Sequence, residues 1–235
     1  MQRTPLINNR GTDRTFKGLQ GRMNYQTKTF SIPLHDRVLT FVQPLDPLAL
    51  IDNLTPEQAR LDKYQPYWVE NWPSAETFIS FLSSYAFTKS LSVIELGCGL
   101  GVLSIILQTL GHSVIATDIA LDGCTCTAIN CKTNCGKSKV ICCDMKQLPF
   151  KNYVPDLILA SDILYEEKMH HLFLSALDTL LTDTNKAWLA DPCRRGWDTF
   201  KKNIGEKYSL TLLHSEDKAI GLRVEIVEIK RKKLQ

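Results

Sequence analysis

The chain has 235 residues, of which 44% are hydrophobic and 23% are charged, as is typical of a globular protein with one compact domain. Its formal net charge of +3 is too small to indicate a nucleic-acid-binding protein. No apolar run approaches the roughly 20 residues that span a bilayer, and the polar N-terminus lacks the apolar core of a secretory signal. We therefore expect a cytoplasmic protein without a membrane partner.

The N-terminal part of the chain predicts a β-hairpin followed by a helix. Residues 1 to about 25 mix Gly, Asn, Arg and Thr without a sustained period and are expected to be loosely ordered. Residues 27–33 and 38–43 alternate apolar and polar side chains around a short polar turn, which indicates two paired strands. The aromatic segment 66–73 then leads into a predicted helix over 74–85.

From residue 91 onward, strand and helix patterns alternate, as in a parallel sheet with helices on both faces. Strands are predicted over 91–96, 113–117, 138–142, 156–161 and 186–191, and helices over 100–110, 121–135, 167–182 and 194–204. The last two strands, 208–214 and 222–229, have no helix between them and must pair as an antiparallel hairpin. The predicted fold class is α/β: a Rossmann-like sheet of five parallel strands plus this hairpin, preceded by the N-terminal β-hairpin.

The segment Val93–Gly101, of sequence VIELGCGLG, carries the strongest chemical signal in the chain. An apolar strand delivers Glu95 and then Gly97, Gly99 and Gly101 into the start of a helix. Glycines at such a turn give the backbone its freedom and let a ligand approach the main-chain amides. A dinucleotide fingerprint is G-x-G-x-x-G, whereas this spacing is G-x-G-x-G with an acid two residues before the first glycine. The pattern indicates a nucleotide-type cofactor.

Acidic residues end the next two predicted strands, where an open α/β sheet binds its ligands. Asp118 comes about 20 residues after the first glycine, where an acid can accept both hydroxyls of a ribose. Asp144 and Met145 follow the third strand, where a carboxylate can accept adenine amino hydrogens beside an apolar wall. Each aspartate could instead cap a helix or end a strand in a turn. Their agreement with the glycine loop favours the cofactor interpretation.

The glycine loop resembles motif I of the S-adenosylmethionine-dependent methyltransferases. Two further motifs are residues 162–165 (DILY), which follow the fourth strand, and residues 72–75 (WPSA) before the loop. Together they resemble family 16 of the seven-strand methyltransferases, whose members pair W-P-[AS]-[GA] with D-x-x-Y and mainly methylate protein lysines. The likeness covers about residues 27–230. Residues 191–195 (DPCRR) also resemble the D-P-x-R segment of the branch that includes the mitochondrial electron-transfer-flavoprotein lysine methyltransferase.

This resemblance implies a methyltransferase domain over 61–235, with an N-terminal extension over 1–60, S-adenosyl-L-methionine as cofactor and a protein lysine as methyl acceptor. Nucleic acid is not expected as a partner, and the protein is expected to be a monomer. The candidate cofactor-binding residues are Trp72, Glu95, Gly97, Cys98, Gly99, Gly101, Asp118, Ile119, Asp144, Met145 and Ser161. The candidate catalytic residues are Asp162 and Tyr165.

The chemistry of lysine methylation gives these residues defined tasks. A lysine amine has a pKa of about 10.4, so holding it neutral at pH 7 costs roughly 4 to 5 kcal/mol. Asp162 can orient the amine, while Tyr165 and Trp72 can desolvate it, although both aromatic residues could simply pack against neighbours. Two alternatives are a small-molecule or nucleic-acid N-methyltransferase on the same fold, and a binding module without catalysis.

The cysteines are interpreted as small buried residues. Of the eight cysteines, six lie between Cys124 and Cys143, and the lack of an export signal indicates reduced thiols. No pair has C-x-x-C spacing, and Cys142 and Cys143 are adjacent in a predicted strand, where neighbouring side chains point to opposite faces. No metal site is therefore predicted. His170 and His171 likewise have no partner with ligand spacing.

Overall fold

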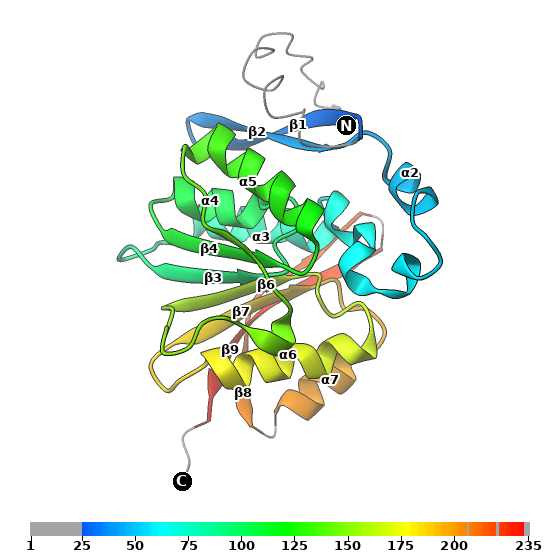
Figure 1. Cartoon of the computed structure of the whole chain (residues 1–235). Helices are drawn as coiled ribbons and strands as arrows, with labels where there is room; N and C mark the ends of the chain where they lie inside the picture. The colour runs from blue at the N-terminus through cyan, green and yellow to red at the C-terminus, as the bar shows by residue number, and fades with distance from the viewer. Residues whose placement is uncertain (1–24, 206, 220, 233–235) are drawn as a thin grey trace.

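The computed structural model describes residues 25–205, 207–219 and 221–232. These residues form a two-stranded hairpin and a seven-stranded sheet with helices on both faces (Figure 1). The predicted α/β, Rossmann-like fold with an N-terminal β-hairpin is thereby confirmed. The loose order expected for the first 25 residues falls almost entirely outside the described ranges. The division of the chain at residue 60 stays a prediction.

Most of the predicted elements are present. The strands are β1 (Thr27–Leu34), β2 (Arg37–Pro44), β3 (Ser92–Leu96), β4 (Ser113–Asp118), β5 (Val140–Cys142), β6 (Leu157–Ser161), β7 (Lys186–Asp191), β8 (Tyr208–Asp217) and β9 (Arg223–Arg231). The helices are α2 (Pro47–Asp52), α3 (Pro73–Ser84), α4 (Val102–Thr109), α5 (Leu121–Cys135), α6 (Glu167–Leu180) and α7 (Trp197–Ile204). Short 3-10 turns are η1 (Gln58–Arg60), η2 (Asp62–Tyr64), η3 (Pro66–Val69) and η4 (Met145–Gln147). Helix α2 and the 3-10 turns are too short to carry a hydrophobic period; the helix start indicated by Thr55 before Pro56 corresponds to the short turn η1, where Thr55 accepts a hydrogen bond from the Gln58 amide at 3.2 Å.

Helix α7 begins at Trp197 and not at the predicted residue 194. The reason lies in the backbone, because Cys193 and Gly196 have φ values of 52° and 103°, outside the region that a right-handed helix allows. Strand β8 extends past the predicted residue 214, since its last residues continue to pair with β9 beyond a bulge near Leu212. The later start of α7 lengthens the loop that follows β7, and this loop borders the candidate site.

The strand order in the sheet is β5-β4-β3-β6-β7-β9-β8, and neighbours from β5 to β7 pair in parallel. The predicted antiparallel hairpin of β8 and β9 is present, and it is β9 that pairs with β7. Since β9 is antiparallel to both of its neighbours, β8 runs in the same direction as the parallel strands. The chain order reverses between β3 and β6, which is where open α/β sheets bind ligands.

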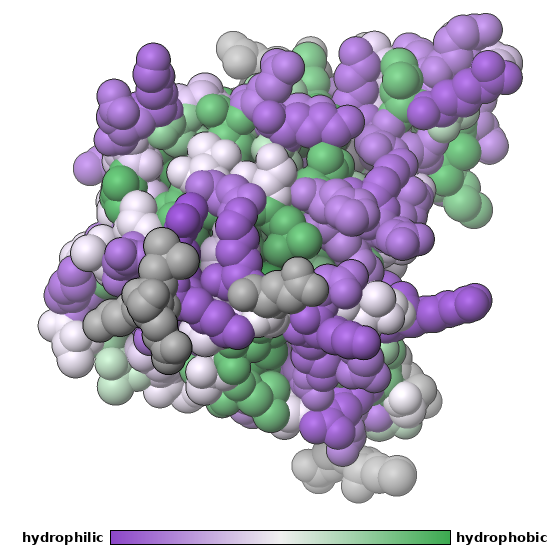
Figure 2. Space-filling model, turned by 90° about the horizontal axis from the view of Figure 1, so that it is seen from below, coloured by the Kyte–Doolittle hydropathy of each residue, from purple (hydrophilic) through white to green (hydrophobic). Residues whose placement is uncertain are grey.

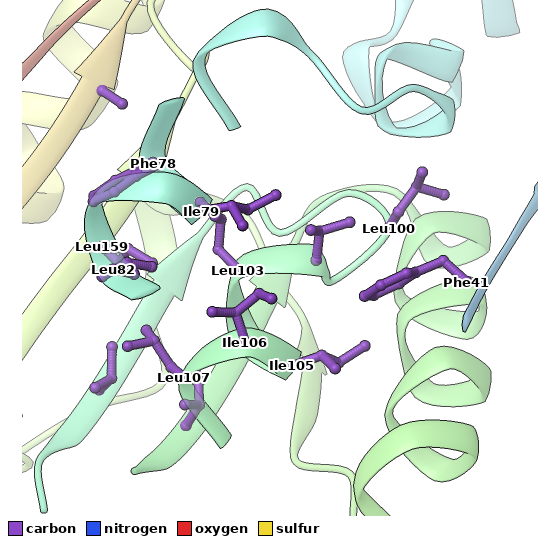
Figure 3. Close-up of a cluster of buried hydrophobic side chains, with 14 of the residues drawn as sticks. Phe41, Phe78, Ile79, Leu82, Leu100, Leu103, Ile105, Ile106, Leu107 and Leu159 are labelled. Atoms are coloured by element: carbon purple, nitrogen blue, oxygen red, sulfur yellow. The ribbon is translucent and has the colours of Figure 1, made fainter. Parts of the chain in front are cut away.

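Helices α3, α4 and α5 cover one face of the sheet, and α6 and α7 cover the other (Figure 1). Helix α4 is apolar around its circumference, and Leu103, Ile105, Ile106 and Leu107 are each 2% exposed or less. Such a helix must be covered on every side. Figure 3 shows Leu103 on the side of Phe78 of α3 and Ile105 on the opposite side of α4, all within one hydrophobic cluster. Because α4 directly follows the glycine loop, its close packing also restrains that loop.

Two asparagines of α5, one helical turn apart, hold the N-terminal hairpin. Asn130 accepts a hydrogen bond from the Val42 amide at 2.7 Å and donates to the Val42 carbonyl at 3.1 Å. Asn134 accepts from the Thr40 amide and donates to the Thr40 carbonyl, both at 2.9 Å. The backbone groups of a strand alternate between its two sides, so these side chains pair the edge of β2 that β1 leaves open. Asn130 also donates to the carbonyl of Leu100 in the glycine loop at 2.9 Å.

The surface mixes polar and apolar residues. Figure 2 shows hydrophilic and hydrophobic residues interspersed over the face seen from below. No helix in the described ranges is long and apolar enough to cross a membrane. More than half of a folded protein's accessible surface is contributed by apolar atoms, so this mixture needs no special explanation.

Candidate active site

A cavity of about 430 Å³ opens at the carboxyl ends of β3, β4 and β6. Every candidate site residue predicted from the sequence lines this cavity except Gly101. Several other lining residues are not among the predicted site residues, namely Asp62, Gln65, Tyr67, Trp68, Glu70, Asn71 and Arg194. Most of these come from the segment 58–71, drawn mainly in cyan at the right of Figure 1. The glycine loop and Asp162 therefore border one cavity.

The glycine loop requires glycine for conformation and for packing. Gly97 and Gly101 have φ values of 70° and 77°, which residues with a side chain rarely adopt. A Cβ atom on Gly97 would lie 2.8 Å from Ile163, and one on Gly101 would lie 2.5 Å from Thr127 of α5. Gly101 thus permits α4 and α5 to pack closely and does not line the cavity, so this geometry does not support its predicted contact with a cofactor.

Glu95 is buried beneath the glycine loop, with 3% of its surface exposed. The Ser104 hydroxyl donates a hydrogen bond to its Oε2. Burial raises the pKa of Glu95 to about 8, so its carboxyl group is held largely neutral at pH 7. A cationic group placed beside it would favour the ionised form. Glu95 can therefore receive a positively charged part of a ligand.

Asp118 ties the end of β4 to the glycine loop. Its Oδ2 accepts a hydrogen bond from the Gly99 amide and its Oδ1 from the Ala120 amide, both at 2.9 Å. Burial raises the pKa of Asp118, and these amides oppose the rise. Each carboxylate oxygen can accept a further hydrogen bond, so Asp118 retains acceptor capacity for ligand hydroxyls. No side chain caps α5, so the capping role left open for Asp118 is not observed.

Asp144 performs the turn role that the sequence left open and also lines the cavity. Its Oδ1 accepts a hydrogen bond from the Lys146 amide at 2.9 Å and begins the turn η4. Met145, which follows β5, and the partly exposed Ile119, which follows β4, also line the cavity. An acceptor next to apolar side chains suits a flat ring that carries amino hydrogens. The adenine-binding role of these residues stays a prediction.

Asp162 joins the WPSA and DILY segments. Its φ of 59° is unusual for a residue with a side chain, and its side chain is 4% exposed. Oδ2 accepts a hydrogen bond at 3.0 Å from the amide of Ser74, in the first turn of α3. A helix N-terminus favours a carboxylate, and Trp72, at the N-cap of α3, supplies no side-chain cap. Asp162 therefore secures the start of α3 from across the cavity.

Arg194 lies between buried carboxylates at the ends of β6 and β7. Its Nη2 is 2.8 Å from Asp162 Oδ1, and its Nη1 is 3.8 Å from Asp191 Oδ2. Burial raises the pKa of Asp191 to about 6. Burial also raises the pKa of Asp162, while Arg194 and the Ser74 amide oppose this rise. Within the described part of the chain, Asp191 Oδ2 and Arg194 Nη1 have no hydrogen-bond partner.

Four aromatic residues contribute to the cavity wall: Tyr67, Trp68, Trp72 and Tyr165. The rings of Tyr67 and Tyr165 have centroids 4.9 Å apart, and Trp72 donates a hydrogen bond from Nε1 to the Tyr67 carbonyl at 2.8 Å. Burial raises the pKa of Tyr165, so its hydroxyl stays neutral near pH 7. The sequence does not single out Tyr67, because a tyrosine in an irregular aromatic segment resembles a packing residue. Its contact with Tyr165 is tertiary and has no local signal.

The rim of the cavity carries several carboxylates. Asp62, Glu70 and Glu166 all belong to its lining. Lys168 bridges two of them, with Nζ 2.8 Å from Asp62 Oδ1 and 2.9 Å from Glu166 Oε2. Exposed pairs of this kind contribute only about 0 to 1 kcal/mol. Lys146 also belongs to the lining, so the carboxylates give this part of the cavity only a small excess of negative charge.

All eight cysteines are free, and Cys124, Cys126 and Cys131 are buried in α5. The Cys126 thiol donates to the Val42 carbonyl at 3.2 Å, so it packs as a small side chain against the hairpin. The described residues hold no group of three or more potential metal ligands. His170 packs against Phe200, with ring centroids 5.3 Å apart.

Comparison with known families gives one match. The model of a family described as lysine methyltransferase matches residues 68–206. That range contains the glycine loop, Asp118, Asp144 and the DILY segment, and it excludes the N-terminal hairpin. Curated protein sequences yield no match to the chain.

Solved structures with a similar fold include several methyltransferases. A ribosomal protein methylase from Lactobacillus delbrueckii subsp. bulgaricus is 21% identical, covering 69% of this chain and 81% of its own, with a TM-score of 0.54. A magnesium protoporphyrin IX methyltransferase from Synechocystis with bound S-adenosylmethionine (SAM) is 17% identical, covering 77% of this chain and 86% of its own, with a TM-score of 0.56. A 16S ribosomal RNA methyltransferase from T. thermophilus, in complex with SAM and guanosine, is 13% identical, covering 88% of this chain and 51% of its own, with a TM-score of 0.59. At these identities the likeness concerns the fold.

Proposed function

Because this chain belongs to the lysine methyltransferase family, we propose that it transfers a methyl group from SAM to the side-chain amine of a protein lysine. The observation that carries the proposal is a single cavity with the glycine loop on one side and the Asp162 and Tyr165 pair on the other. Proteins of the same fold are solved with SAM bound. The expected monomeric state and cytoplasmic location stay predictions.

The residues of the glycine-loop side fit this cofactor. Gly97 and Gly99 line the cavity, and the lack of side chains lets the loop pack against Ile163 and Trp68, while the amides of Cys98, Gly99 and Gly101 are hydrogen-bonded within the fold and hold the loop in place. Glu95 suits the cationic amino group of the methionyl part, because the ammonium would offset the cost of ionising a buried carboxyl group. Asp118 would accept from the ribose hydroxyls, and Asp144 from the adenine amino group. Bound there, SAM supplies an electrophilic methyl carbon on its sulfonium.

The residues of the opposite side would prepare the acceptor. A lysine ammonium that enters past the acidic rim loses a proton to water, and the resulting amine nitrogen bonds to the methyl carbon as the sulfur–carbon bond breaks. Asp162 would orient the amine through its carboxylate. Tyr165, Tyr67 and Trp72 would exclude water and lower the pKa of the ammonium. Alignment of the nitrogen, the methyl carbon and the sulfur then supplies most of the rate.

The test is transfer of label from tritiated SAM into a cell lysate, followed by separation of protein, nucleic acid and small molecules. We expect the label in protein, on lysine. Asp162→Asn, which keeps the side-chain shape, should lower turnover at least about 100-fold while calorimetry finds S-adenosylhomocysteine affinity within a few-fold of wild type. Asp118→Asn should instead weaken that affinity about 10- to 100-fold, as loss of charge-assisted hydrogen bonds predicts.

Other outcomes would favour the alternatives. Label in nucleic acid or in a small molecule would replace the proposed substrate, and relatives of the same fold are named for ribosomal RNA and for a porphyrin. The carboxylates at the rim argue against a polyanion. SAM binding without any transfer would instead indicate a binding module. Equal loss of turnover and cofactor affinity in Asp162→Asn would make Asp162 a structural or cofactor residue.

A further inference from the structure

The carboxylate proposed to meet the substrate amine is already engaged in this structure. Asp162 Oδ1 faces the Arg194 guanidinium at 2.8 Å, and Oδ2 faces the Ser74 amide at 3.0 Å. Its side chain is only 4% exposed. An isolated carboxylate at such a site would tend to take up a proton. Something in the fold must keep Asp162 ionised if it is to hold a cation.

Arg194 is suited to that task. It is the charged group nearest to Asp162, and its other nitrogen, Nη1, faces Asp191 at 3.8 Å. From α3, the contact with Asp162 is a backbone amide, that of Ser74. Glu95 and Tyr165 line the same cavity from β3 and from the segment after β6. With both aspartates ionised, the cluster of Asp162, Arg194 and Asp191 carries one negative charge in excess.

The cluster is also incompletely satisfied. Asp191 is 1% exposed, yet its Oδ2 has no hydrogen-bond partner in the described residues. Asp162 Oδ1 also has none, since its contact with Arg194 is an ion pair without hydrogen-bond geometry, and neither has Nη1 of Arg194. Buried polar atoms without partners are costly and rare. The excess negative charge and the unused acceptor capacity of Asp162 Oδ1, whose residue lines the cavity, together point to a cationic donor that completes the cluster when it binds.

We propose that Arg194 is a positioning residue for the methyl acceptor: it fixes the Asp162 carboxylate against the Ser74 amide and leaves the cluster one negative charge in excess for a cationic amine. This inference rests on the proposed function. Arg194 itself touches no reacting atom in this scheme, because its guanidinium is a permanent cation. It acts through Asp162, which lines the cavity.

The chain offers a matched control in Arg195, which is adjacent, exposed and in no ion pair among the described residues. Arg194→Gln and Arg195→Gln remove the same charge one residue apart. Arg194→Lys keeps the charge but not the planar fork, so it tests whether charge alone suffices. Thermal unfolding and near-ultraviolet circular dichroism would establish that each variant folds. If Arg194→Gln does not fold, the same measurements are made on Arg194→Lys.

The first readout needs no substrate. Carbon-13 NMR titration of the aspartate carboxyl groups, with Asp162→Asn for assignment, measures the ionisation of Asp162 directly. Removing an opposite charge at this range should raise the pKa of Asp162 by about 1 to 3 units in Arg194→Gln. The pKa of Asp162 should stay at the wild-type value in Arg195→Gln and lie between the wild-type and Arg194→Gln values in Arg194→Lys. An unchanged titration of Asp162 in Arg194→Gln would overturn the proposal.

The second readout is methyl transfer. We expect kcat/KM of Arg194→Gln to fall at least tenfold, with S-adenosylhomocysteine affinity within twofold of wild type, and Arg194→Lys to recover part of the loss. The plot of log kcat/KM against pH should steepen below the pKa of Asp162, and this break should move to higher pH in Arg194→Gln. Equal losses of turnover and cofactor affinity would show a merely structural residue. If the wild-type protein methylates no lysine, the proposed function fails, and the NMR titration still decides the role of Arg194.

Discussion

Replacing Asn130 by alanine tests how the N-terminal hairpin is joined to the candidate active site. The side chain is fully buried and makes three hydrogen bonds to backbone groups, two with Val42 and one with Leu100. Val42 and Leu100 are 1% and 2% exposed, so water cannot replace the lost partner. The Val42 carbonyl keeps the Cys126 thiol as a donor. The substitution therefore leaves one buried amide and one buried carbonyl without partners.

Each buried polar group left unpaired costs about 1 to 3 kcal/mol. We therefore expect Asn130→Ala to lower the free energy of unfolding by about 2 to 6 kcal/mol. The matched control is Asn134→Ala, which removes an equivalent pair of hydrogen bonds with Thr40 one turn later. Both Asn134 and Thr40 are partly exposed, so water can replace the amide, and a loss of about 1 kcal/mol is expected.

Equilibrium unfolding in urea, followed by tryptophan fluorescence, measures both free energies by linear extrapolation. Because Leu100 belongs to the glycine loop, Asn130→Ala should also weaken S-adenosylhomocysteine binding several-fold, whereas Asn134→Ala should not. Equal destabilisation by the two substitutions would refute the reasoning from burial. Unchanged cofactor affinity in Asn130→Ala would refute the link between hairpin and loop.

Two further predictions concern the cavity itself. Burial raises the pKa of Glu95 to about 8 from an ordinary value of 4.5, so between these pH values the folded state holds a proton that the unfolded state has released, and stability falls as pH rises. Glu95→Gln does not titrate at this position and serves as the reference. Relative to it, the free energy of unfolding of the wild-type protein without cofactor should fall by up to a few kcal/mol between about pH 5 and pH 8, as measured by urea unfolding at each pH. The same dependence of this free energy on pH in both proteins would contradict the prediction. Tyr67→Ala removes the ring that pairs with Tyr165, and since aromatic pairs contribute about 0.5 to 1.5 kcal/mol, KM for the acceptor protein should rise about 2- to 10-fold. S-adenosylhomocysteine affinity should not change in Tyr67→Ala, and calorimetry would reveal a cofactor role if it did.

The parts of the fold that local patterns predict are those with a regular apolar pattern along the chain. Helix α5 and strand β7 have the bounds expected from the sequence, because α5 buries one face and β7 is an almost continuous buried run. Helix α7 starts later than expected, since the left-handed backbone at Cys193 and Gly196 is not evident from residue types alone. The docking of the hairpin was also not predicted, because Asn130 and Asn134 are ordinary helix-surface residues until β2 lies beside them.

The candidate site divides in the same way. The glycine loop and Asp118 follow directly from chain order, because the carboxyl ends of neighbouring parallel strands meet at one edge. Tyr67 and Arg194 line the same cavity, but they reach it from an irregular segment and from the loop that follows β7. Their roles depend on partners about 100 and 30 residues away in sequence, Tyr165 and Asp162. The spacing of residues within one segment cannot predict contacts between segments so far apart in the sequence.

The contact between Asp162 and Ser74 gives a physical reason for the pairing of the WPSA and DILY segments. Asp162 uses the backbone amide of Ser74, while the Ser74 hydroxyl is buried and has no partner among the described residues. The side chain at position 74 is fully buried, so this position requires a small residue but not a hydroxyl, in agreement with the alanine or serine that the motif allows. Pro73 starts the helix without needing an amide partner, which leaves the next amide for the carboxylate. The two segments are therefore one structural unit, and a change in either should alter the orientation of Asp162 before it alters the glycine loop.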